Sequence, residues 1–124
     1  MKKRILLIGT GGTIASTKHS LGLRPELNID ELINLSGIPQ DKCSLAGITI
    51  MNIDSTNMTP DRWVDIARCI QRNYERFDGF VITHGTDTMA YTSAALTYIF
   101  CNLNKPVIIT GSQYPITEAY TDAV

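Results

Sequence analysis

Short apolar runs alternate with longer amphipathic stretches along the chain. Four of the runs are rich in β-branched residues and bounded by turn formers, and they cover residues 5–8, 48–53, 80–83 and 107–110. Consecutive apolar positions of this length are typical of strands buried on both faces of a parallel sheet. We therefore predict a strand at each of these positions, whereas the pattern does not encode the order of the strands.

The stretches between the apolar runs have apolar residues at the spacing of an α-helix. Thr59 followed by Pro60 predicts a helix start, because a threonine hydroxyl can cap a free amide and proline is tolerated at the first helical position. We expect this helix to reach about Arg76 and to carry one apolar face. That face comprises Trp63, Ile66, Ala67 and Ile70.

A second helix is predicted to begin at Asp87 or Thr88 and to end near Asn102. A shorter helix is expected over residues 30–35, and residues 117–119 resemble the beginning of another. Strands that alternate with helices indicate βαβ units with right-handed crossovers. The predicted class is therefore α/β, with a mostly parallel sheet.

Small, hydroxyl-bearing and glycine-rich segments follow all four predicted strands. These segments are residues 9–13, 54–57, 83–87 and 110–113. In an open parallel sheet, ligands bind in the crevice outside the carboxyl ends of the strands. We therefore expect the four loops to converge on one pocket lined by hydroxyls, amides and a few carboxylates.

Composition narrows the classes of function. The 124 residues are 44% hydrophobic and 19% charged, which is typical of one globular domain. A net charge of −1 without a basic stripe argues against nucleic acid as a partner.

No apolar stretch approaches the roughly 18 residues needed to span a bilayer, and the run in MKKRILLIG is too short for the core of an export signal. Cys43, Cys69 and Cys101 form no CxxC pattern and favour buried free thiols, so we expect a cytoplasmic protein.

The first glycine-rich segment is GTGGTIAS, residues 9–16. One interpretation is a phosphate-binding loop of the Rossmann type, but Ile14 stands where that fingerprint needs its third glycine. A second is that Thr13 is a nucleophile, with backbone amides of the turn as donors for an oxyanion. A purely structural turn fits these residues equally well.

The segment HGTDTMAYT, residues 84–92, adds a hydroxyl and a carboxylate at a predicted helix start. Asp87 is interpreted either as a helix cap or as the group that holds a substrate ammonium, with Thr86 positioning water or relaying a proton. We interpret His84 as a hydrogen-bonded packing residue rather than a base.

The segment DSTNMTP, residues 54–60, offers Asp54 for an ammonium group and Ser55 and Thr56 for a carboxylate. The alternative is an ordinary turn that leads into the next helix. The histidines and cysteines show no metal-ligand spacing, so no metal is expected.

Four stretches together resemble the bacterial L-asparaginase family, and more closely its cytoplasmic type I branch, over essentially the whole chain. They are TGGTIAS at 10–16, NIDSTNMTP at 52–60, DGFVITHGTDTMAYTSAAL at 78–96 and KPVIITGSQ at 105–113. The pair TGGTI and HGTDT at this separation is highly specific. The resemblance implies a three-layer, Rossmann-like or flavodoxin-like domain, with residues 1–124 as the incomplete N-terminal asparaginase domain and the C-terminal domain absent.

The resemblance also implies hydrolysis of L-asparagine to L-aspartate and ammonia through a threonine acyl-enzyme, without cofactor or metal. By motif position, Thr13 resembles the nucleophile, and Thr86 and Asp87 resemble the second threonine and the aspartate of the active site. The implied substrate-binding positions are Asp54, Ser55 and Thr56 for the α-amino and α-carboxylate groups, Thr86, Asp87, and Ser112 near the side-chain amide.

The chain departs from the family in three respects. The active-site lysine lies beyond Val124, and Lys105, which precedes a predicted strand, is no substitute for it. Many members carry a tyrosine in the flexible loop where this chain has residues 22–24, GLR. Members are more than twice as long and form homo-oligomers in which the second domain helps complete a neighbouring site. We therefore predict that the isolated chain has little or no asparaginase activity.

Two alternatives remain open. A glutaminase-type subunit of a tRNA-dependent amidotransferase carries the same motifs, but such subunits usually have an extra domain before the first one, whereas eight residues precede Gly9 here. A non-catalytic module that binds an amino acid has the same pocket residues. The preference between asparagine and glutamine is not encoded in the loops, since one methylene changes specificity by only about 1–3 kcal/mol.

Overall fold

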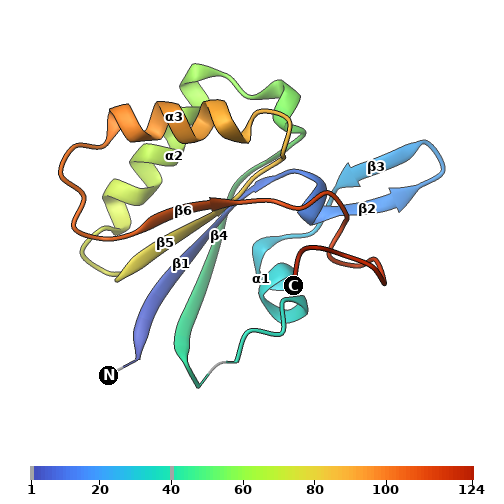
Figure 1. The fold of residues 1–124 in the computed structure, drawn as a ribbon, viewed down its shortest axis with the longest axis horizontal. Coiled ribbons are helices and arrows are strands. Elements are labelled where there is room, and N and C mark those ends of the chain that lie inside the picture. Colours follow the sequence, from blue (N-terminus) through green and yellow to red (C-terminus); the bar gives the residue numbers. More distant parts are fainter. Residues whose placement is uncertain (1, 40) are drawn as a thin grey trace.

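The structure is a computed structural model that describes residues 2–39 and 41–124. Its elements follow one another in the order shown in Figure 1. They are β1 (Lys3–Gly11), the 3-10 helix η1 (Thr13–Ala15), β2 (Ser16–His19), β3 (Gly22–Pro25), α1 (Ile29–Leu35), β4 (Cys43–Ile53), the 3-10 helix η2 (Ser55–Asn57), α2 (Pro60–Asn73), β5 (Gly79–Thr83), α3 (Met89–Ile99) and β6 (Val107–Thr110). The four predicted strands and three of the predicted helices are confirmed, although the helix predicted to end near Asn102 ends at Ile99.

A parallel sheet in the order β4-β1-β5-β6 forms the centre of the fold. Helices α2 and α3 lie on one side of this sheet and α1 lies on the other (Figure 1). The three-layer α/β class is therefore confirmed. Because all four strands run in the same direction, the loops that follow them leave the sheet at the same edge.

The central strand β1 is buried on both faces, as its run of apolar residues predicted. Leu6 and Ile8 pack with Ile66 and Ile70 of α2 in one hydrophobic cluster. Leu7 points to the other face and belongs to the cluster that contains residues of α1. Strand β1 thus holds the two layers of helices together and fixes the position of the loop after Gly11.

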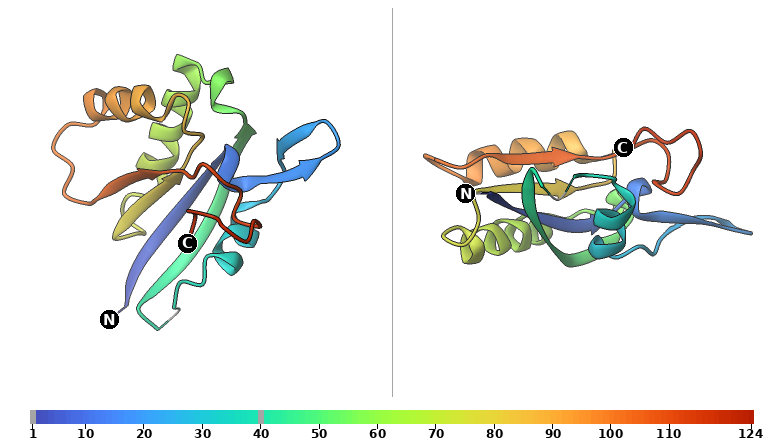
Figure 2. Two further views of the ribbon diagram at one scale, coloured as in Figure 1. Left: turned by 45° about the vertical axis from the view of Figure 1, so that its right-hand side comes forward. Right: turned by 90° about the horizontal axis from the view of Figure 1, so that it is seen from below.

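Residues 16–25 form an antiparallel hairpin, β2 and β3, which the sequence did not predict. The hairpin projects away from the sheet in both views of Figure 2. Glu26, which follows β3, contacts β2: its carboxylate accepts a hydrogen bond from Thr17 Oγ1 at 2.7 Å and lies 2.8 Å from His19 Nε2. These contacts tie β2 to the residue that follows β3.

Helix capping differs from the prediction. Thr59 precedes Pro60 at the start of α2, but its side chain makes no capping hydrogen bond, and the helix ends at Asn73 rather than near residue 76. The side-chain cap lies instead at α1, where Asn28 and Glu31 form a capping box. Proline alone therefore marks the start of α2.

The helix predicted over residues 117–119 is wrong. Successive turns replace it, since the Glu118 N–H donates to Pro115 O and the Thr121 N–H donates to Glu118 O. The Asp122 carboxylate accepts the backbone N–H groups of Gln113 and Tyr114. This folds the segment back onto the loop after β6 and prevents a continuous helix.

Two further expectations concern the thiols and the membrane. Cys69 is buried, Cys43 is half-buried and Cys101 is exposed, so the prediction of buried thiols is wrong for Cys101. Across residues 2–39 and 41–124, no helix has the length and apolar character required to cross a bilayer.

Candidate active site

The loops after β1, β4 and β5 enclose a small pocket at the carboxyl edge of the sheet. Its volume is about 150 Å³, which is the space of roughly five water molecules. The lining residues are Gly12, Thr13, Ser16, Leu23, Asp54, Ser55, Gly85, Thr86 and Asp87. Three separate segments of the sequence therefore bring hydroxyls and carboxylates to one cavity, as the positions of the loops predicted.

Two glycines allow the three loops to approach one another closely. Gly12 has φ 81° and ψ 179°, a conformation that is essentially restricted to glycine. A Cβ atom on Gly12 would lie 2.4 Å from the backbone nitrogen of Gly85, and one on Gly85 would lie 2.6 Å from Ser55 Oγ. Residues with side chains at these two positions would push the loops apart, so the pocket depends on both glycines.

Thr13 begins the 3-10 helix η1. Ser16 Oγ donates to Gly12 O at 2.9 Å, and the Ala15 N–H donates to the same oxygen at 3.2 Å, so the turn around Thr13 is fixed by its neighbours. Thr13 is half-buried, and its hydroxyl makes no hydrogen bond to any part of the chain that the structure describes. This hydroxyl is thus positioned by the backbone and available to a ligand.

Ser55 supplies a buried hydroxyl to the pocket wall. The residue is 2% exposed, and its Oγ atom has no hydrogen-bond partner within the described residues. The Thr88 hydroxyl donates to Ser55 O at 2.7 Å and ties this loop to the start of α3. A buried polar atom without a partner is rare in native proteins. Here the residue lines a cavity, in which an atom of a bound ligand would supply the missing hydrogen-bond partner.

Asp54 is held by Thr56. Its Oδ1 atom accepts the Thr56 backbone N–H and the Thr56 hydroxyl, each at 2.8 Å. These hydrogen bonds hold the pKa of Asp54 below its usual value, so the carboxylate is charged at neutral pH. Asp54 lines the pocket, whereas Thr56 is exposed and does not. The structure therefore connects Thr56 to the pocket only through Asp54.

Thr86 and Asp87 lie beside Thr13 in the pocket. The N-cap of α3 is Thr88, so the interpretation of Asp87 as the helix cap is wrong. Its carboxylate and the Thr86 hydroxyl form no hydrogen bonds within residues 2–39 and 41–124. Both groups are therefore free to contact a small molecule that also reaches Thr13.

His84 lies behind this loop and is fully buried. Its ring contacts Gly85 O at 2.7 Å and the Thr92 hydroxyl at 2.8 Å. Burial lowers the pKa of His84, although the hydrogen bond to Gly85 opposes this shift. The interpretation of His84 as a hydrogen-bonded packing residue is confirmed.

Ser112 is not brought into the pocket. The residue is 1% exposed, and its hydroxyl donates to Tyr114 O at 2.6 Å. None of the residues that line the pocket comes from the loop after β6. Three of the four predicted loops therefore converge, and the fourth folds back on itself.

Leu23 lines the pocket from the tip region of the hairpin, which sequence reasoning missed. The sequence drew attention to residues 22–24 only because they lack a tyrosine. Their approach to the pocket depends on the hairpin, for which the polar sequence gave no strand signal. An apolar side chain, and not a phenol, therefore lines the pocket from residues 22–24.

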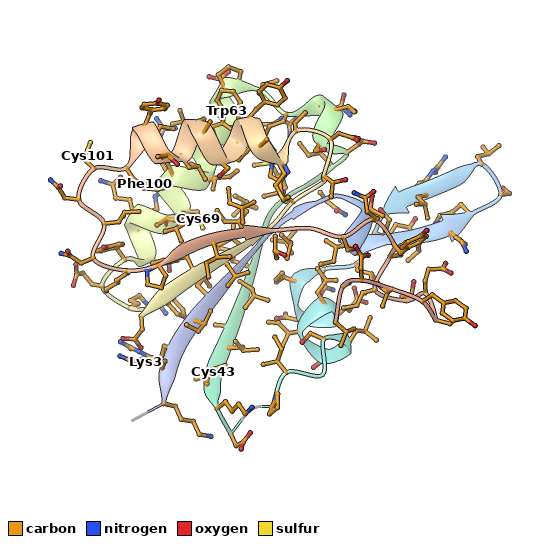
Figure 3. The ribbon with its side chains drawn as sticks, in the orientation of Figure 1. Lys3, Cys43, Trp63, Cys69, Phe100 and Cys101 are labelled. Atoms are coloured by element: carbon orange, nitrogen blue, oxygen red, sulfur yellow. The ribbon has the colours of Figure 1, made fainter. Side chains whose placement is uncertain are left out.

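A larger cavity of about 690 Å³ lies elsewhere, between α2 and the segment that follows α3. Its lining includes Tyr74, Glu75, Phe100 and Leu103 but contains no serine, threonine, aspartate or histidine. Figure 3 shows Phe100 and Cys101 at the far end of α3, on the side of this cavity. The smaller pocket is the candidate active site because it gathers serine and threonine hydroxyls and two aspartates from three loops at the carboxyl edge of the sheet.

No group of three or more histidine, cysteine, aspartate or glutamate side chains capable of holding a metal ion is found in the part of the chain that the structure describes. The chemistry available in the pocket is that of hydroxyls, carboxylates and backbone amides.

Comparison with known proteins identifies the family of the chain. The family model for the asparaginase N-terminal domain matches residues 4–124. The chain belongs to this family. The L-asparaginase of Thermococcus kodakarensis is 46% identical over 97% of this chain and 37% of its own length. L-asparaginase 1 of Escherichia coli strain K12 is 42% identical over 98% of this chain and 37% of its own length.

Solved structures of asparaginases have the same fold. The thermostable L-asparaginase from Thermococcus kodakarensis superposes with a TM-score of 0.89 and 45% identity, over 97% of this chain and 37% of that one. The probable cytoplasmic L-asparaginase from Campylobacter jejuni gives a TM-score of 0.82 and 36% identity, over 98% of this chain and 36% of that one. The chain thus spans little more than a third of the length of these asparaginases.

Proposed function

We propose that this chain forms the nucleophile-bearing part of an amidohydrolase that converts L-asparagine to L-aspartate and ammonia. The observation that carries the proposal is that Thr13, Thr86 and Asp87 line one pocket of amino-acid size. Their hydroxyls and carboxylate have no partners within the described residues, so all three can engage a ligand at once. Family membership and the asparaginase relatives support this chemistry.

In the proposed reaction, Thr13 Oγ1 attacks the side-chain amide carbon of asparagine as its proton passes to a base. Collapse of the tetrahedral intermediate breaks the C–N bond, and the leaving nitrogen takes up a proton and departs as ammonia. Water then attacks the resulting ester, so that L-aspartate forms and the Thr13 hydroxyl is restored. Thr86 positions the water or relays the proton.

Substrate recognition is proposed to divide between charge and hydrogen bonding. The carboxylates of Asp87 and Asp54 attract the α-ammonium group, since both line the pocket. The unpaired hydroxyl of Ser55 donates to the α-carboxylate, which removes the cost of burying it alone. Thr56 acts by holding Asp54. A role for Ser112 near the side-chain amide stays a prediction. Its hydroxyl donates to Tyr114 O, and the residue does not line the pocket.

Further properties are proposed from the family resemblance. Residues 1–124 are the incomplete N-terminal domain of a longer cytoplasmic protein, which acts as a homo-oligomer without nucleic acid or membrane partners. A cytoplasmic location is supported by the name of the Campylobacter jejuni relative. Because the lysine and the second domain lie outside these residues, the isolated chain is expected to release little or no ammonia from L-asparagine.

A chimera tests the proposed function directly. Residues 1–124 would replace the matching segment of the Thermococcus kodakarensis L-asparaginase, to which this chain is 46% identical. We expect the chimera to release ammonia from L-asparagine and the Thr13→Ala chimera to lose that activity. Thr97→Ala is the matched control, because Thr97 is exposed on α3 and its hydroxyl bonds only Ser93 O of its own helix.

Calorimetry with L-aspartate separates the enzyme from a binding module. A folded chimera that binds L-aspartate, before and after Thr13→Ala, but never releases ammonia would favour the module and overturn the proposed hydrolysis. Equal ammonia release by the Thr13→Ala and Thr97→Ala chimeras would instead remove Thr13 from the role of nucleophile.

A further inference from the structure

A continuous chain of hydrogen bonds connects Trp63, near the start of α2, to Gly85 in the loop after β5. The Trp63 indole N–H donates to Thr92 Oγ1 at 2.9 Å, and Thr92 Oγ1 lies 2.8 Å from His84 Nε2. His84 Nδ1 then lies 2.7 Å from the carbonyl oxygen of Gly85. The three side chains come from α2, α3 and the end of β5, and none of them lines the pocket. In Figure 3, Trp63 lies beside α3, on the helical side of the molecule.

The chemistry of the groups assigns every proton in this chain. Gly85 O can only accept, so His84 Nδ1 must carry the hydrogen. In the neutral ring Nε2 is then an acceptor, and the single proton of the Thr92 hydroxyl must donate to it. Trp63 can only donate, and it uses a lone pair of Thr92 Oγ1. Each group therefore has one possible role, and the network has one proton arrangement.

We propose that His84, held through Thr92 and Trp63, is a positioning residue that fixes the plane of the Gly85–Thr86 peptide beside the pocket. This inference rests on the proposed function of that pocket. The peptide is trans, so its N–H points opposite to its C=O. Because the Gly85 carbonyl is drawn toward His84, the Thr86 N–H is directed away from the ring.

The Thr86 N–H makes no hydrogen bond within the described residues. Thr86 itself lines the pocket, so this amide is a donor for an oxygen of a bound ligand. Its direction is set by the His84 ring, and the ring is set by a hydroxyl and an indole on two different helices. The packing of α2 against α3 is thereby connected to the geometry of the site.

Burial keeps the histidine in the required neutral form. His84 and Thr92 are both 0% exposed, and burial lowers the pKa of His84 with no contribution from a charged side chain. A protonated ring would donate from Nε2 to Thr92 Oγ1. Thr92 Oγ1 would then accept hydrogen bonds from both Trp63 and His84, and its own proton would have no acceptor within the network. This further disfavours the protonated ring.

The test uses three threonine variants of α3 in the 124-residue chain. Thr92→Val keeps the shape of the side chain but removes its hydroxyl, and Thr92→Ser restores the hydroxyl without the methyl group. Thr97→Val makes the same chemical change as the first variant on the same helix, where the hydroxyl bonds only Ser93 O. Comparison of the three separates loss of the network from loss of a threonine.

Nitrogen NMR of the histidine rings gives the first measurement, and it needs no variant. We expect His84 in the unmodified chain to carry its hydrogen on Nδ1 and to be neutral at pH 7, because burial lowers its pKa. The second measurement is the set of backbone amide signals of residues 85–87. We expect single sharp signals in the unmodified chain, Thr92→Ser and Thr97→Val, and shifted or multiple signals in Thr92→Val.

Binding of L-aspartate gives the functional measurement. Loss of one buried hydrogen bond corresponds to about tenfold in affinity, so Thr92→Val is expected to bind about tenfold more weakly than the unmodified chain and Thr97→Val. Thr92→Ser is expected to regain most of that affinity. The single tryptophan supplies an independent signal, since Trp63 emission should change in Thr92→Val and not in Thr97→Val.

Three results would overturn the positioning role: a hydrogen on Nε2 of His84, a charged ring at pH 7, or unchanged 85–87 amide signals in Thr92→Val. If Thr92→Val does not fold, the ring measurement on the unmodified chain still decides the proton arrangement, and Thr92→Ser decides whether the hydroxyl suffices. If the unmodified chain binds no L-aspartate, binding is measured in the chimera; a folded chimera that also fails to bind would count against the proposed function, whereas the ring and amide signals still test the positioning.

Discussion

Replacing Gly12 by alanine is expected to break the contact between the loop that carries Thr13 and the loop that carries Thr86. The added Cβ would lie 2.4 Å from Gly85 N and 2.6 Å from Gly85 Cα. Both atoms belong to backbone, so neither can move aside by rotating a side chain. The two loops must separate, and the pocket between them must change shape.

The magnitude follows from two costs. A non-glycine residue in a conformation such as that of Gly12, with φ 81° and ψ 179°, costs about 1–3 kcal/mol. Overpacking against a fixed neighbour adds about 1–3 kcal/mol. The expected loss in the free energy of unfolding is therefore about 2–6 kcal/mol, a large part of the roughly 5–15 kcal/mol available to a domain.

Two other glycines serve as controls that separate the cost of the loop contact from the cost of the backbone conformation. Gly22 and Gly37 have φ values of 118° and 65°, on either side of that of Gly12, and a Cβ atom on either would meet nothing within 4 Å. Alanine at these two positions should cost only the backbone contribution, about 1–3 kcal/mol. The excess loss in Gly12→Ala measures the close approach of the two loops.

Urea unfolding followed by circular dichroism measures these differences. With an m-value of about 2 kcal/mol/M, an excess of 2 kcal/mol lowers the midpoint by about 1 M relative to the controls. Equal midpoints for Gly12→Ala and both controls would show that the loops do not pack as described, and the assignment of one shared pocket would lose its geometric basis.

Three further predictions concern the pocket. Ser55→Ala should raise the free energy of unfolding by about 1 kcal/mol, because it removes a buried hydroxyl without a partner, and should weaken L-aspartate binding about tenfold; a less stable variant in urea would contradict this. In the chimera, Leu23→Tyr should raise kcat about tenfold or more, since acid–base help is worth at least that, whereas Leu23→Phe should not. Asp54 has a lowered pKa because of Thr56, so its contribution to stability is complete above its usual value of 3.8 and disappears as pH falls through the lowered pKa. Asp54→Asn should therefore flatten the acid side of the stability profile, and an unchanged slope between pH 5 and 2 would refute the assignment.

Much of the fold follows from local sequence. The apolar runs at 48–53 and 80–83 lie within β4 and β5, and Pro60 marks the first residue of α2. These features depend on neighbours within one turn or one strand, and side-chain periodicity records them directly. Two local predictions failed: Thr59 precedes α2 without a capping hydrogen bond, and turns held by Asp122 replace the helix at 117–119.

The chemical groups of the site could also be predicted, because each lies just after a strand. Thr13, Thr86 and Asp87 share a pocket, and the parallel direction of β1 and β5 places their loops at the same edge of the sheet. Ser112 occupies the equivalent place after β6 but turns its hydroxyl to Tyr114 O. The sequence identifies which loops carry hydroxyls, and it cannot specify which of these hydroxyls point into the cavity.

The sequence by itself determined the four strands of the parallel sheet, three helices and the set of reactive residues. Only the tertiary structure decided the order β4-β1-β5-β6, the approach of Leu23 through the hairpin, and the hydrogen bonds that join Trp63 to His84. The physical reason is range. Backbone propensity and periodicity act between residues close in the chain, whereas the pocket is made by packing between segments that are far apart in the sequence.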